Sequence, residues 1–128
     1  MLEEIIIKID EDRPGILADI GEILGRADVN IETLSASDYN GQGVMHLVVD
    51  DGEDAAEALK SSGYKVETVR PVLATTLDDR PGALGRYCRQ LTESGVMISA
   101  AYVARRAGGE TELIVAVDDL DTAQQASG

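Results

Sequence analysis

The sequence predicts an α+β protein made of two tandem βαββαβ units, the second of which lacks its last strand. The first observation is a duplication: Arg13-Pro14-Gly15 recurs as Arg80-Pro81-Gly82, so the motif starts at positions 13 and 80, an offset of 67 residues. The second is that each copy follows a strand-like pattern and opens an amphipathic helix. A fixed period of this length indicates a repeated structural unit. We therefore expect a first unit over residues 1–70 and a second over residues 71–128.

The first strand and helix of unit one are predicted from apolar periodicity. Residues 3–10 alternate in polarity, as is typical of a half-buried strand. A helix is expected over residues 15–27, with Asp12 as its N-cap and Pro14 in its first turn, where a missing N–H costs nothing. The expected apolar stripe of this helix consists of Ile16, Leu17, Ile20, Ile23 and Leu24.

The rest of unit one follows from turn signals. Asn40-Gly41-Gln42-Gly43 is typical of a hairpin turn between two strands. An alanine-rich helix is expected next, ended by Gly63, and Pro71 marks the boundary between the units. The expected elements are strands over residues 30–37 and 44–49, a helix over 53–62 and a closing strand over 65–69.

Unit two repeats this order until the chain runs out. Strands are expected over residues 72–77, 97–104 and 112–117, with Arg105-Arg106 at the hairpin tip and a short helix from about Leu120. Without a closing strand, the strand over 72–77 would be an unpaired edge that another chain or segment must cover. The first helix of this unit is expected to carry Leu84, Tyr87, Cys88 and Leu91 on one face.

Composition excludes several classes of partner. The chain has 128 residues and a net charge of −13, which repels phosphate backbones and anionic lipid. We therefore expect neither nucleic acid nor a membrane as partner, and no stretch of 18 apolar residues is present. The acidic start lacks the basic region of a signal peptide, and one cysteine permits no internal disulfide. These features favour a cytoplasmic location.

The repeated motif resembles that of the ACT domain, a ferredoxin-like βαββαβ module that senses ligands on enzymes of amino-acid metabolism and in free-standing tandem proteins. The resemblance covers nearly the whole chain. It is carried by a strand followed by Asp12-Arg13-Pro14-Gly15-Ile16-Leu17 and then Val29-Asn30-Ile31. The second copy matches less well, with Asp79-Arg80-Pro81-Gly82-Ala83-Leu84 and then Val96-Met97-Ile98.

The motif also makes physical sense as a binding loop, because a turn into a helix N-terminus presents free N–H groups that suit a carboxylate. The resemblance implies two amino-acid sites, each between the loop of one unit and the second strand of the other. The first site would have Asp10, Glu11, Asp12, Arg13, Pro14 and Gly15 facing residues 97–100, including Met97 and Ile98. The second would have Asp78, Asp79, Arg80 and Gly82 facing Asn30, Ile31, Glu32 and Thr33.

The two implied sites are chemically unequal. Asn30 can donate to a carboxylate and accept from an amine, whereas its counterpart Met97 does neither strongly. Two other interpretations stay open at this stage: the Arg-Pro-Gly turn could be only a tight turn, and Asn30 could cap its own backbone.

Other candidate residues are expected to be structural. His46 has no second histidine or cysteine near it in the sequence, and Cys88 lies on an apolar helix face. The acidic clusters at 50–54 and 118–121 lack the pattern of a calcium loop and suit helix capping. No nucleophile–base pair, zinc spacing or phosphate loop is present, so we expect no enzymatic activity, no metal and no cofactor.

The sequence is therefore consistent with two functions. One is a non-enzymatic regulatory protein that binds a small amino acid between its units. The other is a ligand-free interaction subunit that docks on a metabolic enzyme. In either case we expect the strands over 30–37 and 97–104 to join the two sheets into one antiparallel sheet, and the chain to form a homodimer.

Overall fold

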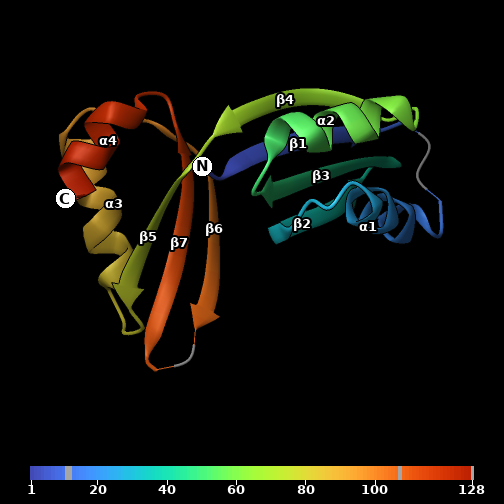
Figure 1. Cartoon of the computed structure of the whole chain (residues 1–128). Coiled ribbons are helices and arrows are strands. Elements are labelled where there is room, and N and C mark those ends of the chain that lie inside the picture. Colours follow the sequence, from blue (N-terminus) through green and yellow to red (C-terminus); the bar gives the residue numbers. More distant parts are fainter. Residues whose placement is uncertain (11–12, 107, 128) are drawn as a thin grey trace. The chain divides into compact units, whose positions relative to one another are not determined.

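The chain folds into two compact units, Met1–Arg70 and Pro71–Gly128. The structure, a computed structural model, describes residues 1–10, 13–106 and 108–127. Each unit has one antiparallel sheet and two helices, which confirms the predicted α+β fold of tandem βαββαβ units (Figure 1). That the two sheets join into one stays a prediction.

The first unit has the complete βαββαβ order. Its sheet follows the order β2-β3-β1-β4, and the hairpin register runs from Ile31 opposite Val49 to Tyr39 opposite Gln42. The turn is Asn40-Gly41, both with positive φ (55° and 79°), the conformation that an Asn-Gly hairpin turn favours. The elements are β1 (Glu3–Ile9), α1 (Ile16–Arg26), β2 (Ile31–Tyr39), β3 (Gln42–Val49), α2 (Gly52–Ser61) and β4 (Lys65–Pro71).

Both helices of the first unit pack on the same face of its sheet (Figure 1). The alternation predicted for β1 is observed, because Ile5, Ile7 and Ile9 are buried against the helices. Ile20 and Leu24 supply the helix side of this core and are fully buried. This packing fixes the start of α1 over the end of β1, where the candidate site lies.

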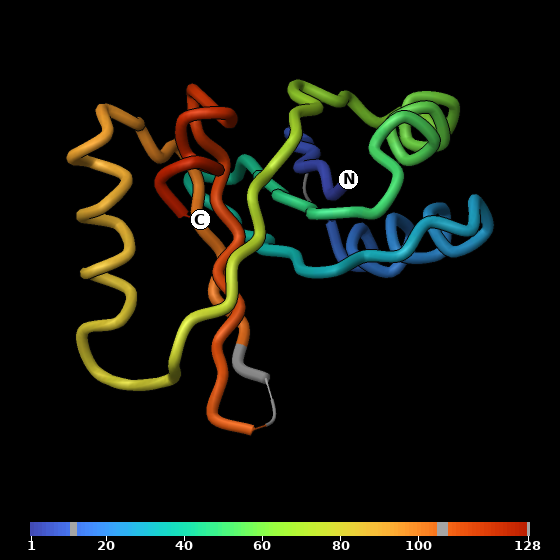
Figure 2. The backbone as a smooth tube through the Cα atoms, turned by 60° about the vertical axis from the view of Figure 1, so that its left-hand side comes forward, coloured from blue at the N-terminus to red at the C-terminus, as the bar shows by residue number. Residues whose placement is uncertain are grey.

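The second unit has three strands and two helices, with the sheet order β5-β7-β6, so β5 lies at an edge as predicted. In Figure 2 the backbone of β5 runs along β7, and α3 stands on one side of these strands. Its core is built around Tyr87, Leu91, Leu113 and Val115. The elements are β5 (Leu73–Asp78), α3 (Ala83–Glu93), β6 (Ile98–Arg106), β7 (Glu110–Val117) and α4 (Leu120–Ser127).

Three local expectations were wrong. Gly15, and not Asp12, occupies the N-cap position of α1, without a side-chain cap; Asp12 itself lies outside the described residues. Arg105-Arg106 is not the hairpin tip, because β6 continues through Arg106. Leu17 and Leu84 do not join the cores: they are 50% and 45% exposed. Within the described residues, no helix is long and apolar enough to cross a membrane.

Candidate functional site

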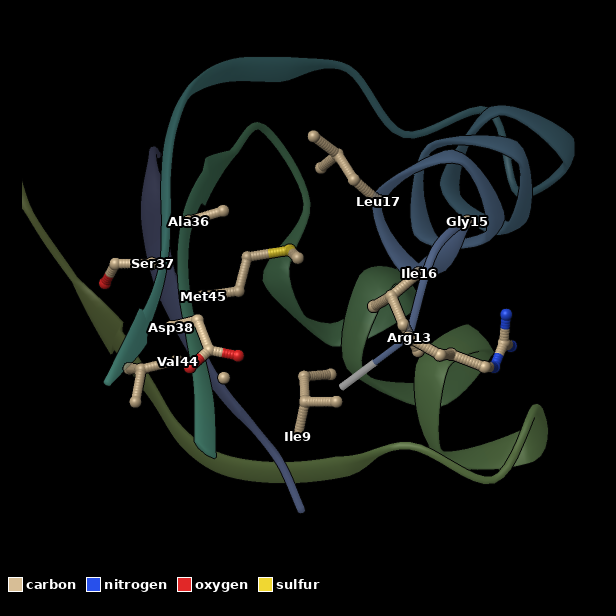
Figure 3. A pocket seen from close by; sticks show the side chains of 11 residues that line it. Ile9, Arg13, Gly15, Ile16, Leu17, Ala36, Ser37, Asp38, Val44 and Met45 are labelled. Carbon is tan, nitrogen blue, oxygen red and sulfur yellow. The ribbon is translucent and has the colours of Figure 1, made fainter. Parts of the chain in front are cut away.

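A pocket of about 250 Å³ lies at the end of the first unit where β1 stops, α1 begins and the β2–β3 hairpin turns. Figure 3 shows it between the first turn of α1 and the two hairpin strands. It is lined by Ile9, Arg13, Gly15, Ile16, Leu17, Ala36, Ser37, Asp38, Gly43, Val44 and Met45. The Arg-Pro-Gly turn singled out from the sequence therefore borders a pocket.

The wall formed by α1 begins at Gly15, which has a φ of 94° in the left-handed region that favours glycine. The Gly15 carbonyl accepts the Asp19 N–H at 2.9 Å, and the Ile16 N–H reaches the Arg13 carbonyl at 3.5 Å. Within the described residues, the N–H groups of Leu17 and Ala18 have no hydrogen-bond partner. The first turn of α1 thus offers free donors and the positive end of the helix dipole beside the pocket.

The Arg13 side chain points away from the pocket (Figure 3). Its Nη2 donates to Asp19 Oδ2 at 2.7 Å and its Nη1 donates to the Pro14 carbonyl at 3.2 Å. The hydrogen bond from Arg13 to Asp19 raises the pKa of the Arg13 guanidinium, although the side chain is exposed to solvent. Arg13 therefore stabilises the turn, and a ligand carboxylate would meet backbone N–H groups first.

Among the described residues, the lining of the pocket is mostly apolar and carries one carboxylate. Leu17 and Met45 point into it from opposite walls, with Ile9 below them (Figure 3). Asp38 also points inward from β2, whereas Ser37 points to the other side of the sheet. Asp38 Oδ1 accepts the Gly41 N–H at 3.1 Å, so the hairpin turn holds this carboxylate in place.

The second unit has a smaller pocket, of about 150 Å³, at the equivalent place. Arg80 and Leu84 line it and lie 67 residues after Arg13 and Leu17. Its hairpin wall is different, because Val103 lies 67 residues after Ala36, and Thr111 stands where the first unit has Gly43, since Thr111 pairs with Arg105 as Gly43 pairs with Asp38. Both pockets therefore derive from the duplicated unit but differ in size and lining.

The sequence-predicted residues of the first loop divide into two groups. Arg13 and Gly15 line the pocket, and Pro14 is exposed at its rim. Asp10 lies next to it and accepts the Gln42 Nε2–H at 3.5 Å. Glu11 and Asp12 lie outside the described residues.

Asn30 and Ile31 lie at the opposite end of the hairpin from this pocket. Ile31 pairs with Val49 at one end, whereas the pocket lies at the other end, where Asp38 pairs with Gly43. The Asn30 side-chain amide donates to Glu32 Oε1 at 3.0 Å, and its backbone N–H donates to Asp50 Oδ1 at 3.0 Å. Ile31 is half-buried against the core. That Asn30 faces the loop of the other unit stays a prediction.

The predicted residues of the second unit divide in the same way. Asp78, Asp79 and Arg80 line the smaller pocket, with Arg80 Nη2 3.5 Å from Asp78 Oδ2, and Gly82 occupies the N-cap of α3 with φ 88°. Met97 is 65% exposed, and its N–H donates to Asp118 Oδ1 at 2.9 Å. Ile98 packs against the second core.

Asp38, Ala36 and Met45 were missed by the sequence reasoning. Two signals were available in the sequence. The alternation along the hairpin places these three residues on one face of the two strands, and Leu17 recurs as Leu84 beside the second Arg-Pro-Gly turn.

A charged cluster on the first sheet was also missed. Glu4 is fully buried; its Oε1 accepts from Arg70 Nε at 2.6 Å, and its Oε2 lies 3.3 Å from His46 Nδ1. His46 is therefore a strand-face side chain, as expected, but it has a specific partner. The signal was available in the sequence, because Glu4 and His46 lie on the same face of neighbouring strands β1 and β3.

Other features behave as structural elements. Asp51 caps α2 by accepting the Asp54 N–H at 3.0 Å, as the acidic pattern predicted. Cys88 is half-buried against the second core. Within the described part of the chain, no three His, Cys, Asp or Glu side chains gather closely enough to hold a metal ion.

Comparison with known proteins places the chain in a family. A family profile described as ACT domain pair matches residues 2–126. No curated protein sequence matches the chain. Among solved structures, protein BT0572 from Bacteroides thetaiotaomicron superposes with a TM-score of 0.83 at 21% identity, covering 97% of this chain and 84% of that chain.

Two further structures are regulatory subunits of aspartate kinase. The one from Thermus thermophilus, in its ligand free form, has a TM-score of 0.74 at 17% identity and covers 98% of this chain and 87% of that chain. The one from Thermus flavus has a TM-score of 0.71 at 16% identity, covering 98% and 90%. At such low identities these similarities concern the fold.

Proposed function

This chain belongs to the family of ACT domain pairs, and from that premise we propose that it is a non-enzymatic regulatory module that binds a small amino acid at its Arg-Pro-Gly loops. The observation that carries the proposal is the pocket beside Gly15, repeated at the equivalent place in the second unit. The similarity in fold to regulatory subunits of aspartate kinase supports the regulatory part of the proposal.

The chemistry of the loop supports an amino acid as ligand. A carboxylate is stabilised by the free N–H groups and dipole at the start of α1. The pocket is smaller than the range of about 300–1,000 Å³ typical of drug-sized ligands, so it suits a small metabolite. The neighbouring unit, through Met97 and Ile98 at this loop and through Asn30 at the other, is proposed to complete each site.

A thermal-shift panel of the twenty amino acids tests this proposal. A ligand that binds only the folded state stabilises it by about 2.7 kcal/mol at one hundred times Kd. For a domain of this size each kcal/mol raises Tm by roughly 3–5 °C, so a true ligand shifts Tm by about 10 °C. Gly15→Val should abolish the shift, because valine is strained at this φ and closes the approach to the loop. If millimolar amino acids leave Tm unchanged, the proposal fails.

The alternative is a ligand-free subunit that docks on a metabolic enzyme. The observation that favours it is the open edge of the second sheet, where β5 has a strand partner on one side. In that case amino acids would leave Tm unchanged, whereas a partner enzyme would bind through this edge. The thermal-shift panel therefore separates the two functions.

A further inference from the structure

We infer that the ligand is an amino acid with an aliphatic side chain, and that each chain binds it at the pocket of the first unit and not at that of the second, with Asp38 receiving the ammonium group. This inference rests on the proposed function and deepens it, because a small amino acid of any kind would satisfy that function. It is carried by the lining of the first pocket and by the differences between the two pockets.

The lining selects for an aliphatic side chain. Ile9, Ile16 and Met45 form the floor and are 4–7% exposed, so the floor presents hydrocarbon and a thioether. Leu17 adds an apolar wall. It is 50% exposed, although Ile20 and Leu24 on the same apolar stripe of α1 are fully buried. An exposed leucine beside a pocket gains free energy when an apolar group covers it, at about 25 cal/mol per Å² buried. A charged or strongly polar ligand side chain would instead lose its hydration against this lining.

The ammonium group of an amino acid has one carboxylate to meet. Among the described side chains that line the pocket, Asp38 is the acidic one, and it points inward (Figure 3). One of its oxygens accepts the Gly41 N–H, which leaves the second oxygen available for a cation. Arg13 does not neutralise it, because the guanidinium is engaged with Asp19. A charge-assisted hydrogen bond to an ammonium group is therefore the interaction that this position favours.

The second pocket differs from the first in its space and in the position of its carboxylates. Val103 and Thr111 replace Ala36 and Gly43 in its wall, which accounts for a volume of about 150 Å³ against about 250 Å³. The carboxylates that line it, Asp78 and Asp79, lie on the Arg-Pro-Gly loop and not on the hairpin, and Asp78 Oδ2 is 3.5 Å from Arg80 Nη2. Because the second pocket has less space and its Asp78 carboxylate lies beside the Arg80 guanidinium, it suits the ligand less well, and we assign one ligand to each chain.

Isothermal titration calorimetry with leucine on the full chain tests the inference, and the expected stoichiometry is one leucine per chain. Leucine, isoleucine, valine and methionine should bind at least tenfold more tightly than glycine, serine, lysine or aspartate. Leu17→Ala should weaken leucine binding about tenfold, because it removes an apolar wall. Leu84→Ala is the matched control at the equivalent position of the second pocket and should leave the affinity unchanged.

The role of Asp38 is tested with a pair of ligands. 4-Methylpentanoate has the side chain and carboxylate of leucine but no ammonium group, so it should bind the unmodified chain at least tenfold more weakly than leucine. In Asp38→Asn the amide oxygen can still accept from Gly41, so the turn is kept while the charge is lost. The difference between the two ligands should then shrink to less than about threefold.

The outcomes separate this inference from the proposed function. If no amino acid binds, the proposed function fails and the inference fails with it. If glycine, serine, lysine or aspartate binds and the aliphatic amino acids do not, the proposed function holds and the inference is overturned. A stoichiometry of two, an equal effect of Leu84→Ala, or an unchanged preference for leucine in Asp38→Asn would also overturn it.

Discussion

At the scale of single residues, the buried carboxylate of Glu4 is the feature with the clearest energetic consequence. It accepts from Arg70 Nε at 2.6 Å and lies 3.3 Å from His46 Nδ1. Glu4→Gln keeps the size of the side chain but removes its charge, and hydrogen bonds to charged groups contribute about 1.5–3 kcal/mol. We expect the free energy of unfolding in urea to fall by about that amount. The loss is not larger, because Arg70 and His46 are each about one-third exposed and can be hydrated when the carboxylate charge is removed. The exposed Glu57→Gln is the control, and an equal loss in both variants would contradict this role.

The same residue scale shows where sequence reasoning stops. The Arg-Pro-Gly loop could be found because glycine is required where φ is positive and because the motif is repeated. Leu17 could not be distinguished from the buried positions of its helix, because periodicity gives the direction of a side chain and not where the sheet beneath it ends. In the sequence, Asp38 resembles any polar residue at the end of a strand. The hairpin register is what places it beside the start of α1.

At the scale of elements, α4 depends on the cap formed by Asp119. Its carboxylate accepts from the Thr122 hydroxyl at 2.6 Å and from the Thr122 N–H at 3.1 Å, and these bonds lower its pKa below the ordinary 3.8. A carboxyl whose folded pKa is lowered contributes stability above its unfolded pKa, and this contribution is lost as the pH falls through the folded value. Asp119→Asn should therefore have a lower Tm than the unmodified chain at pH 7, with the difference shrinking as the pH falls below 3.8 toward the folded pKa.

The control for the cap is Asp121→Asn, which removes an exposed charge from the same first helical turn but no cap. It should change Tm less than Asp119→Asn at pH 7. A difference for Asp119→Asn that stays constant between pH 7 and pH 3 would show that the carboxylate charge is not what stabilises α4.

Element types and their order could be predicted from the sequence because local rules determine them. The alternation of Ile5, Ile7 and Ile9 predicted a strand, and Asn40-Gly41 predicted a tight hairpin turn. The hairpin tip of the second unit was misplaced because Arg105-Arg106 continues the strand, and an edge strand tolerates a charged pair in its sequence. The Glu4 cluster joins positions 4, 46 and 70, which local patterns do not connect.

At the scale of the whole molecule, we expect a homodimer in which the predicted pairing of β2 with β6 forms between two chains and buries exposed apolar side chains. The edge strand β6 exposes 57% of Val103, and the edge strand β2 exposes 79% of Tyr39. Strand edges of this kind pair readily, and burial of their apolar side chains favours association. Light scattering at tens of micromolar should give about twice the chain mass of 13.6 kDa.

Val103→Lys should shift the population toward the monomer, because a lysine on an edge strand resists pairing. Gln90→Lys, which adds the same charge on the exposed face of α3, should leave the mass unchanged. A mass near 13.6 kDa for the unmodified chain would contradict the homodimer, and an unchanged mass for Val103→Lys would place the contact elsewhere than β6.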